Sequence, residues 1–180
     1  MGQALLIVDV QAGLFLCEPA PYQAQAVLER INGLAARARA QEVPVLYIQH
    51  DGPPGSGLEP GCLGWQLHPG LQRDERDRVV RKSACDGFLD TELALLLSEL
   101  DVQELFICGY ATEFCVDTLV RRAASEGFAV RLVGDAHTTK DRPVLKAEQI
   151  IAHHNWLLAE LIQPQRPLQV LPAAQVVFRR

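Results

Sequence analysis

Short apolar runs alternate with amphipathic segments along most of the chain. The runs are rich in Val, Ile and Leu at consecutive positions, which is typical of strands buried on both faces of a sheet. The intervening segments place apolar residues at helical spacing, as Val27, Ile31 and Leu34 do. We predict strands at residues 4–10, 43–49, 78–82, 104–110 and 129–136, with 168–171 and 175–178 as candidates for a last strand.

Helices are predicted at residues 23–42, 90–100, 142–161 and in the segment that follows Gly109. Asp90 or Thr91 is the expected cap of the second helix, and Thr112 the expected cap of the helix after Gly109. Pro143 is expected near the start of the last helix, where proline is tolerated. This alternation predicts an α/β fold: one domain over residues 1–180, with three α/β/α layers around a Rossmann-like, doubly wound sheet of about six mostly parallel strands.

One segment breaks the alternation. Residues 50–72 are rich in Gly and Pro and carry no periodic pattern. A loop of this length in a compact domain is usually functional or disordered. Trp65 and Leu67 are large apolar residues within it, so we predict an ordered cover rather than a free linker.

Composition and charge narrow the function classes. The chain has 180 residues, 48% of them hydrophobic and 22% charged, with a net charge of −5. These values are typical of a soluble globular protein, and the scattered Lys and Arg argue against nucleic-acid binding. We expect no membrane association, since no apolar run is long enough to cross a bilayer. We also expect no signal peptide, because the first residues lack a basic segment and a cleavage-like site.

The chain has five cysteines, an odd number at irregular spacings and without a CxxC pair. This usage predicts free thiols in a reducing compartment, and therefore a cytoplasmic protein. It argues against a disulfide framework and against a structural zinc site.

Chemically able residues end or follow the five predicted strands: Asp9, residues 49–51, Lys82, Cys115 and residues 135–137. Ligands of such sheets bind outside the carboxyl ends of the strands, where Asp9, Lys82 and Cys115 are expected. Asp9 is either a poorly solvated base or a cap of the following turn. Lys82 is either a solvated strand end or a positive charge that stabilises neighbouring anions.

Cys115 is either a nucleophile or an ordinary core residue, as Cys108 in the preceding strand is expected to be. Its place in the first helical turn predicts a lowered thiol pKa and free backbone N–H groups for an oxyanion. Beside an acid–base group and a cation, this thiol fits the pattern of an activated nucleophile without a histidine.

Several motifs together resemble the isochorismatase-like family of cysteine hydrolases, which includes nicotinamidases and other small amidohydrolases. The resemblance covers nearly the whole chain. The motifs are LLIVDVQAGLF (5–15), VVRKSACDGF (79–88), GYATEFCVDTLVRRAASEGF (109–128), VGDAHTT (133–139) and AEQIIAHHN (147–155).

The resemblance implies the isochorismatase-like hydrolase fold and a catalytic triad of Asp9, Lys82 and Cys115. It also implies a cis peptide between Tyr110 and Ala111, and an oxyanion hole formed by the N–H groups of Ala111 and Cys115. The implied reaction is hydrolysis of a small linear or cyclic amide through a thioester. A homo-oligomer, dimer or tetramer, is implied as well.

The chain departs from the family pattern at two places. Nicotinamidases of this family carry an Asp-x-His metal pair after the second strand, whereas Asp51 here follows His50 and has no His two positions later. We therefore predict no metal and no cofactor, and nicotinamide is a less expected substrate. Ala111 stands where close relatives have Gln, which leaves the backbone role intact but alters the pocket wall.

Two other functions stay open at this point. The first is hydrolysis of a vinyl ether, as in isochorismatases, or of a carbamate or ureido group. The second is a non-catalytic binding or oligomeric scaffold whose Cys115 is merely oxidisable.

Five residues are predicted to line a pocket for a small-molecule substrate: Phe15, Trp65, Tyr110, Glu113 and Phe114. Each aromatic residue has core packing as its alternative role. Glu113 either meets a cationic substrate or makes a structural hydrogen bond. His137 is expected to be structural, and His153 and His154 point in different directions and form no metal pair.

Overall fold

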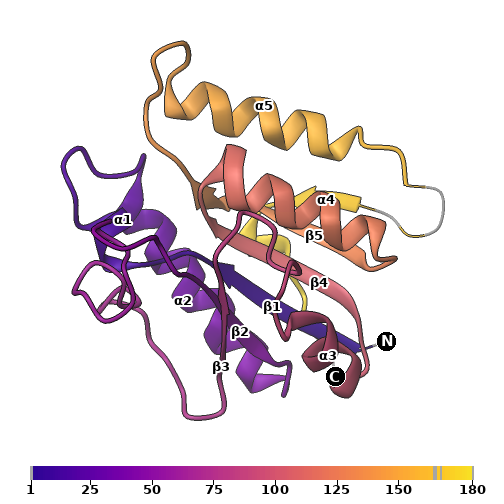
Figure 1. The fold of residues 1–180 in the computed structure, drawn as a ribbon. Coiled ribbons are helices and arrows are strands. Elements are labelled where there is room, and N and C mark those ends of the chain that lie inside the picture. The colour runs from indigo at the N-terminus through magenta and orange to yellow at the C-terminus, as the bar shows by residue number, and fades with distance from the viewer. Residues whose placement is uncertain (1, 164–165, 167, 180) are drawn as a thin grey trace.

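The computed structural model describes residues 2–163, 166 and 168–179. Six strands form one sheet in the order β3-β2-β1-β4-β5-β6, and every pairing is parallel (Figure 1). The predicted α/β class and the sheet of six parallel strands are confirmed. The strands are β1 (Gly2–Val8), β2 (Val45–His50), β3 (Arg78–Lys82), β4 (Val102–Tyr110), β5 (Ala129–Thr138) and β6 (Leu168–Leu171).

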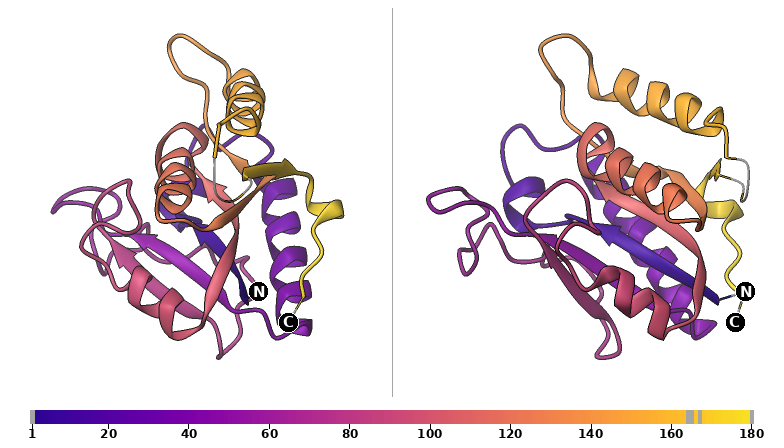
Figure 2. Two further views of the ribbon diagram at one scale, coloured as in Figure 1. Left: turned by 90° about the vertical axis from the view of Figure 1, so that its right-hand side faces the viewer. Right: turned by 45° about the vertical axis from the view of Figure 1, so that its right-hand side comes forward.

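Helices cover both faces of the sheet (Figure 2). They are α1 (Ala12–Phe15), α2 (Ala24–Ala40), α3 (Leu93–Glu99), α4 (Asp117–Ser125) and α5 (Ala147–Ala159), with the shorter turns η1 (Thr112–Val116) and η2 (Ala173–Gln175). Ile31 of α2 packs in one core with Leu5, while Leu119 of α4 and Leu158 of α5 pack in the core of the opposite face. Among the described residues, no helix is long and apolar enough to cross a membrane.

The last predicted helix starts later than its pattern indicates. α5 begins at Ala147, so Pro143 lies in the preceding loop and not in the first turn. The carboxylate of Asp141 accepts hydrogen bonds from the Ala147 N–H (3.0 Å) and from the Lys146 ammonium (2.7 Å). These bonds hold residues 141–146 in a loop that ends at the helix N-terminus.

Of the two candidates for the last strand, 168–171 is β6 and 175–178 is not a strand. Arg37 of α2 donates to the carbonyls of Ala173 and Val176, at 2.7 and 3.0 Å. Val176 and Phe178 are buried against the sheet and its covering helix. The second apolar run therefore packs as an irregular segment, because side-chain donors take up carbonyls that a strand would pair.

Two predicted helix caps are wrong. The residue before α3 is Glu92, and Asp90 adopts a left-handed conformation (φ +53°) outside the helix. Thr91 comes closer, since its hydroxyl accepts a hydrogen bond from the Leu93 N–H at 3.2 Å. Thr112 does not precede its helix but is the first residue of η1, where its hydroxyl meets His137.

In this strand order the direction of winding reverses between β1 and β4. Ligands of doubly wound sheets bind outside the carboxyl ends of the strands at such a point. Gly109 lets the strands approach, because a Cβ at this position would lie 2.1 Å from the Val8 carbonyl oxygen. In Figure 1 the amino terminus lies at the right-hand end of the sheet, and α1 gathers with the 50–72 loop at the left-hand, carboxyl end.

Candidate active site

Asp9 is the first residue beyond β1 and turns sharply out of the strand. Its backbone is left-handed (φ +49°), a conformation that Asp tolerates better than most residues. Its N–H still donates to Ile48 (2.8 Å), and its carbonyl accepts from Gln11 (2.9 Å). The side chain is buried, and among the described residues its Oδ1 has no hydrogen-bond partner. One carboxylate oxygen is therefore free to accept a proton at this end of the sheet.

Lys82 ends β3 and reaches the same point with its ammonium group. Its Nζ donates to Asp9 Oδ2 at 2.9 Å, to the Ala84 carbonyl at 3.0 Å and to Cys115 Sγ at 3.3 Å. Lys82 is only 3% exposed, so bulk water does not screen its charge from the Asp9 carboxylate or from the Cys115 sulfur. The structure thus brings together Asp9, Lys82 and Cys115, which are far apart in the sequence.

Cys115 lies in η1, a wide π-helical turn between β4 and α4. The Val116 N–H donates to the Ala111 carbonyl, five residues back, at 3.1 Å. Such turns are rare and occur frequently at functional sites, because the extra residue reorients the side chains around it. The turn directs Cys115 toward Lys82, while Val116, Leu119 and Val120 remain buried against the sheet as their spacing predicts.

The prediction that the helix N-terminus lowers the thiol pKa is wrong. Cys115 is only 9% exposed, and this burial raises its pKa, as does the adjacent Asp9 carboxylate. Lys82 opposes both effects but does not overcome them. For Lys82 itself, burial lowers the pKa, whereas Asp9 and then Cys115 raise it more, so that the net pKa lies above its ordinary value. The resting site is thus a neutral thiol beside an Asp–Lys ion pair.

The turn that carries Cys115 is held from behind by a buried histidine. The peptide between Tyr110 and Ala111 is cis, and η1 starts directly after it. His137 of β5 lies 2.8 Å from the Thr112 hydroxyl and 2.8 Å from Oδ1 of Asn155 on α5. Since that amide oxygen can only accept, His137 carries its proton on Nε2 and accepts from Thr112. Burial lowers the pKa of His137 to about 4, which keeps it neutral and structural, as expected.

The 50–72 loop is tied to the site through two glutamines and a tryptophan. The fully buried Gln11 donates to the carbonyls of His50 (2.9 Å) and Trp65 (2.8 Å). Gln49 donates to the same Trp65 carbonyl at 2.9 Å. The Trp65 indole donates to Asp51 at 2.8 Å, and the Arg81 guanidinium lies over its ring. These contacts order the loop as a cover at the carboxyl end of the sheet.

The predicted pocket residues fall into different environments. Phe15 and Tyr110 are buried with their rings in edge contact at 5.8 Å, so both also belong to the core. Phe114 is 49% exposed and lies under the guanidinium of Arg142. Glu113 accepts hydrogen bonds from Arg142 and from the Thr139 hydroxyl, an arrangement that corresponds to the structural alternative.

The arrangement after β2 differs from a metal site. Asp51 is held by the Trp65 indole and in an ion pair with Arg81 at 2.7 Å. In the part of the chain that the structure describes, no three His, Cys, Asp or Glu side chains gather as a possible metal site. The donor set around Lys82 contains an ammonium group, which repels a cation.

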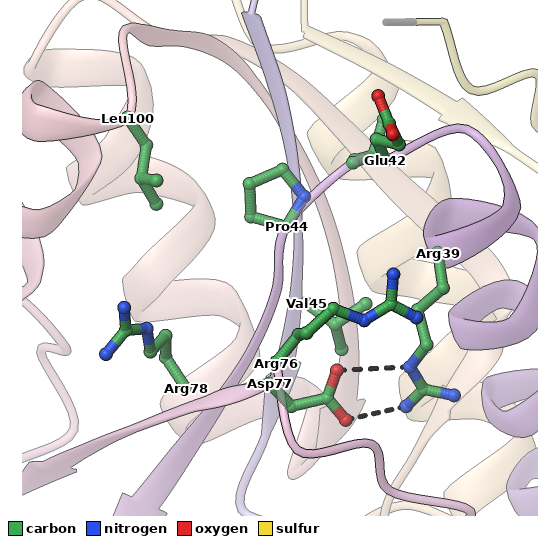
Figure 3. Close-up of a pocket in the computed structure, with 9 residues that line it drawn as sticks. Arg39, Glu42, Pro44, Val45, Arg76, Asp77, Arg78 and Leu100 are labelled. Atoms are coloured by element: carbon green, nitrogen blue, oxygen red, sulfur yellow. Dashed lines mark hydrogen bonds and ion pairs between the residues drawn. The ribbon is translucent and has the colours of Figure 1, made fainter.

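A separate cavity of about 320 Å³ lies at the opposite, amino end of β2 and β3 (Figure 3). Arg39, Arg76 and Arg78 contribute to its lining. Arg39 donates to both carboxylate oxygens of Asp77, at 3.1 and 2.7 Å, so that arginine is already neutralised. None of the predicted site residues lines this cavity.

Sequence reasoning assigned no role to two residues at the carboxyl end of the sheet. Nδ1 of His50 lies 3.5 Å from Lys82 Nζ, because His50 pairs with Lys82 in the register of β2 and β3. Gln11 clamps the backbone of His50 on both sides. The signal for His50 was its position at a strand end, whereas Gln11 carries no pattern that marks it.

Comparisons with known proteins show which family the chain is similar to. The family model of the isochorismatase domain matches residues 3–162. A streptothricin hydrolase of Streptomyces noursei is 44% identical over 141 residues, which cover 78% of this chain and 51% of that protein. This chain thus spans about half the length of that curated relative, and 56% of a second streptothricin hydrolase from the same organism.

Solved structures resemble the chain over nearly its full length. A crystal structure of an isochorismatase family protein has 35% identity and a TM-score of 0.85, covering 94% of this chain and 97% of that one. An isochorismatase from Pseudomonas putida KT2440 has 28% identity and a TM-score of 0.87, covering 97% and 90%. The family model and these relatives establish the assignment that the motifs indicated: this chain belongs to the isochorismatase family.

Proposed function

We propose that the protein hydrolyses a C–N bond of a small amide, with Cys115 as the nucleophile. The observation that carries the proposal is the position of Lys82 Nζ, which contacts both Asp9 Oδ2 (2.9 Å) and Cys115 Sγ (3.3 Å) in a nearly dry site. A lysine that contacts both a carboxylate and a thiol supplies a charge beside a base and a nucleophile.

The first half-reaction forms a thioester. Asp9 takes the proton from the Cys115 thiol as its sulfur attacks the substrate carbonyl carbon, and the carbonyl electron pair moves to oxygen. The N–H groups of Ala111 and Cys115 stabilise that oxyanion, a contribution of about 10²–10³-fold for one donor. The oxyanion then collapses, the C–N bond breaks, and the proton on Asp9 passes to the departing amine.

The second half-reaction restores the enzyme. Asp9 deprotonates a water molecule, which attacks the thioester carbonyl and expels the sulfur. The proton held by Asp9 returns to Cys115, and the carboxylic acid leaves. Lys82 remains an ammonium throughout, since its pKa lies above its ordinary value, and it stabilises whichever of Asp9 or Cys115 is negative. The raised thiol pKa means that Asp9 removes the proton during attack.

The relative named a streptothricin hydrolase supplies the first substrate to test. Streptothricin and a panel of primary and cyclic amides are incubated with the protein, and the products are followed by mass spectrometry and by ammonia release. We expect hydrolysis that falls by about 10⁴-fold or more in Cys115→Ala. Cys108→Ala is the matched control, since Cys108 is a buried thiol in the core of β4. Amide hydrolysis that survives in Cys115→Ala contradicts the proposal.

Isochorismate and a set of ureido and carbamate compounds, added to the panel, separate the alternatives. Hydrolysis of a vinyl ether proceeds without a thioester, so activity on isochorismate that is retained in Cys115→Ala would favour that reaction. A scaffold without catalytic function would turn over no member of the panel. A preference for ureido or carbamate compounds over simple amides would keep the thiol mechanism and change only the substrate class.

A further inference from the structure

We propose that His50 binds the substrate: its Nε2–H donates a hydrogen bond to a second oxygen of the substrate, close to the scissile amide. The inference rests on the proposed function in one respect, that the substrate amide binds next to Cys115. His50 is half-buried at the end of β2, and its ring is next to Lys82, which itself contacts Cys115. Lys82 therefore contacts both the His50 ring, at 3.5 Å, and the Cys115 sulfur, at 3.3 Å.

The Gln11 side chain holds the backbone of His50, the last residue of β2, at both its N–H and its carbonyl. Gln11, fully buried, accepts from the His50 N–H at 2.9 Å and donates to the His50 carbonyl at 2.9 Å. A third bond from Gln11 goes to the Trp65 carbonyl at 2.8 Å. One side chain thus fixes His50 relative to both the start of α1 and the covering loop. Rigid support of this kind is what an orienting residue of a binding site needs.

The neighbouring lysine determines which nitrogen of His50 carries the proton. An ammonium group has three N–H donors, and those of Lys82 are used by Asp9, the Ala84 carbonyl and Cys115. No further N–H of Lys82 is left for His50, whose Nδ1 lies 3.5 Å from Lys82 Nζ. A positive charge at that distance favours a lone pair on Nδ1, so the proton lies on Nε2.

The charged groups around the His50 ring keep it neutral but do not accept a hydrogen bond from it. Burial and then Lys82 lower the pKa of His50, while Asp9 and Asp51 oppose them. Asp51 is occupied by the Trp65 indole and by Arg81, and Asp9 by Lys82. Among the described residues, Nε2 of His50 has no hydrogen-bond partner. The ring thus presents one N–H donor that no neighbouring side chain takes up.

The substrate class follows from this donor. A site built to hydrogen-bond a substrate group discriminates strongly against an analogue that lacks it. We therefore infer amides that carry a hydroxyl or carbonyl oxygen on the carbon next to the scissile carbonyl, in preference to purely aliphatic amides.

Binding to Cys115→Ala tests the inference without requiring turnover. Lactamide and isobutyramide are matched probes, since one has a hydroxyl where the other has a methyl group. Their affinities are measured by NMR titration, with ¹⁵N-histidine labelling to follow the ring of His50. We expect lactamide to bind about tenfold more tightly, the effect of one lost hydrogen bond. The preference should vanish on adding His50→Ala, persist in part with His50→Gln, which retains a donor near Nε2, and vanish with His50→Asn.

His153→Ala in the same background is the control, because His153 is an exposed histidine on α5. The inference is overturned if lactamide has no advantage, if its advantage survives His50→Ala, or if neither amide binds. Failure of the proposed function gives a different result: Cys115→Ala binds lactamide with the His50-dependent preference, yet the unsubstituted protein hydrolyses no amide.

Discussion

Replacing Lys82 with Met is expected to destabilise the fold through the charge that it leaves behind. The Lys82 and Asp9 side chains are 1% and 3% exposed, and their charged atoms lie 2.9 Å apart. In Lys82→Met the Asp9 carboxylate stays buried without a counter-charge. Removal of one partner of a buried ion pair costs about 3–5 kcal/mol. Because domains of this size have a net stability of about 5–15 kcal/mol, the loss is easily measured.

The double variant Asp9→Asn/Lys82→Met separates this charge effect from lost packing. It removes both charges and keeps side chains of similar volume. Replacing a buried pair by uncharged groups is often neutral, so we expect the double variant to regain most of the stability lost in Lys82→Met. The free energy of unfolding lost in the double variant is then much smaller than the sum of the losses in the two single variants, and the difference measures the coupling.

Urea unfolding at pH 7 and at rising pH measures the free energy of unfolding of four proteins: the original, Asp9→Asn, Lys82→Met and the double variant. The folded pKa of Lys82 is raised above its ordinary value of 10.5. Its contribution is therefore complete below pH 10.5 and is lost as pH rises through the folded pKa. Over this series, the difference in free energy of unfolding between the original protein and Lys82→Met should shrink only in that alkaline range. A single variant within about 1 kcal/mol of the original protein would refute the buried-pair reasoning.

Three further outcomes follow from the geometry. In thermal unfolding, Gly109→Ala should destabilise the fold by about 3 kcal/mol or more, since φ is +123° and the new Cβ would meet the Val8 carbonyl. Gly33→Ala is the control in the same assay and should be neutral or stabilising, because a Cβ at this position of α2 meets nothing within 4 Å. His137 has a folded pKa of about 4 against an ordinary 6.5, so the original protein should lose about 3 kcal/mol relative to His137→Gln as pH falls from 6.5 to 4, and parallel stability curves would count against this. Trp65→Phe removes the indole donor that orders the covering loop, so KM should rise several-fold while kcat stays nearly unchanged. A marked fall in kcat would instead indicate damage to the reacting groups.

The sheet and the positions of the three central residues could be predicted because both depend on local pattern. Apolar runs of strand length, separated by helical segments, leave few topologies, and the carboxyl ends of parallel strands meet at one edge. Asp9, Lys82 and Cys115 each follow or end such a run, so their proximity follows from the strand order once it is known. The family motifs reinforced the same positions.

Features that depend on long-range contacts could not be predicted. The wide turn at Cys115, the raised thiol pKa and the clamp of Gln11 on His50 come from burial and from partners distant in sequence. The late start of α5 depends on Asp141, whose bonds to the helix N-terminus outweigh the apolar periodicity before it. The pattern shows which residues reach the site, whereas their protonation is determined by tertiary packing.

Interception of the acyl-enzyme by a second nucleophile detects a thioester on Cys115. The amide that the protein hydrolyses fastest is turned over in the presence of hydroxylamine, which attacks a thioester to give a hydroxamate, and the products are separated by mass spectrometry. We expect hydroxamate from the unsubstituted protein and from Cys108→Ala, and neither hydroxamate nor acid from Cys115→Ala. Amide hydrolysis by Cys115→Ala at the original rate would contradict this expectation.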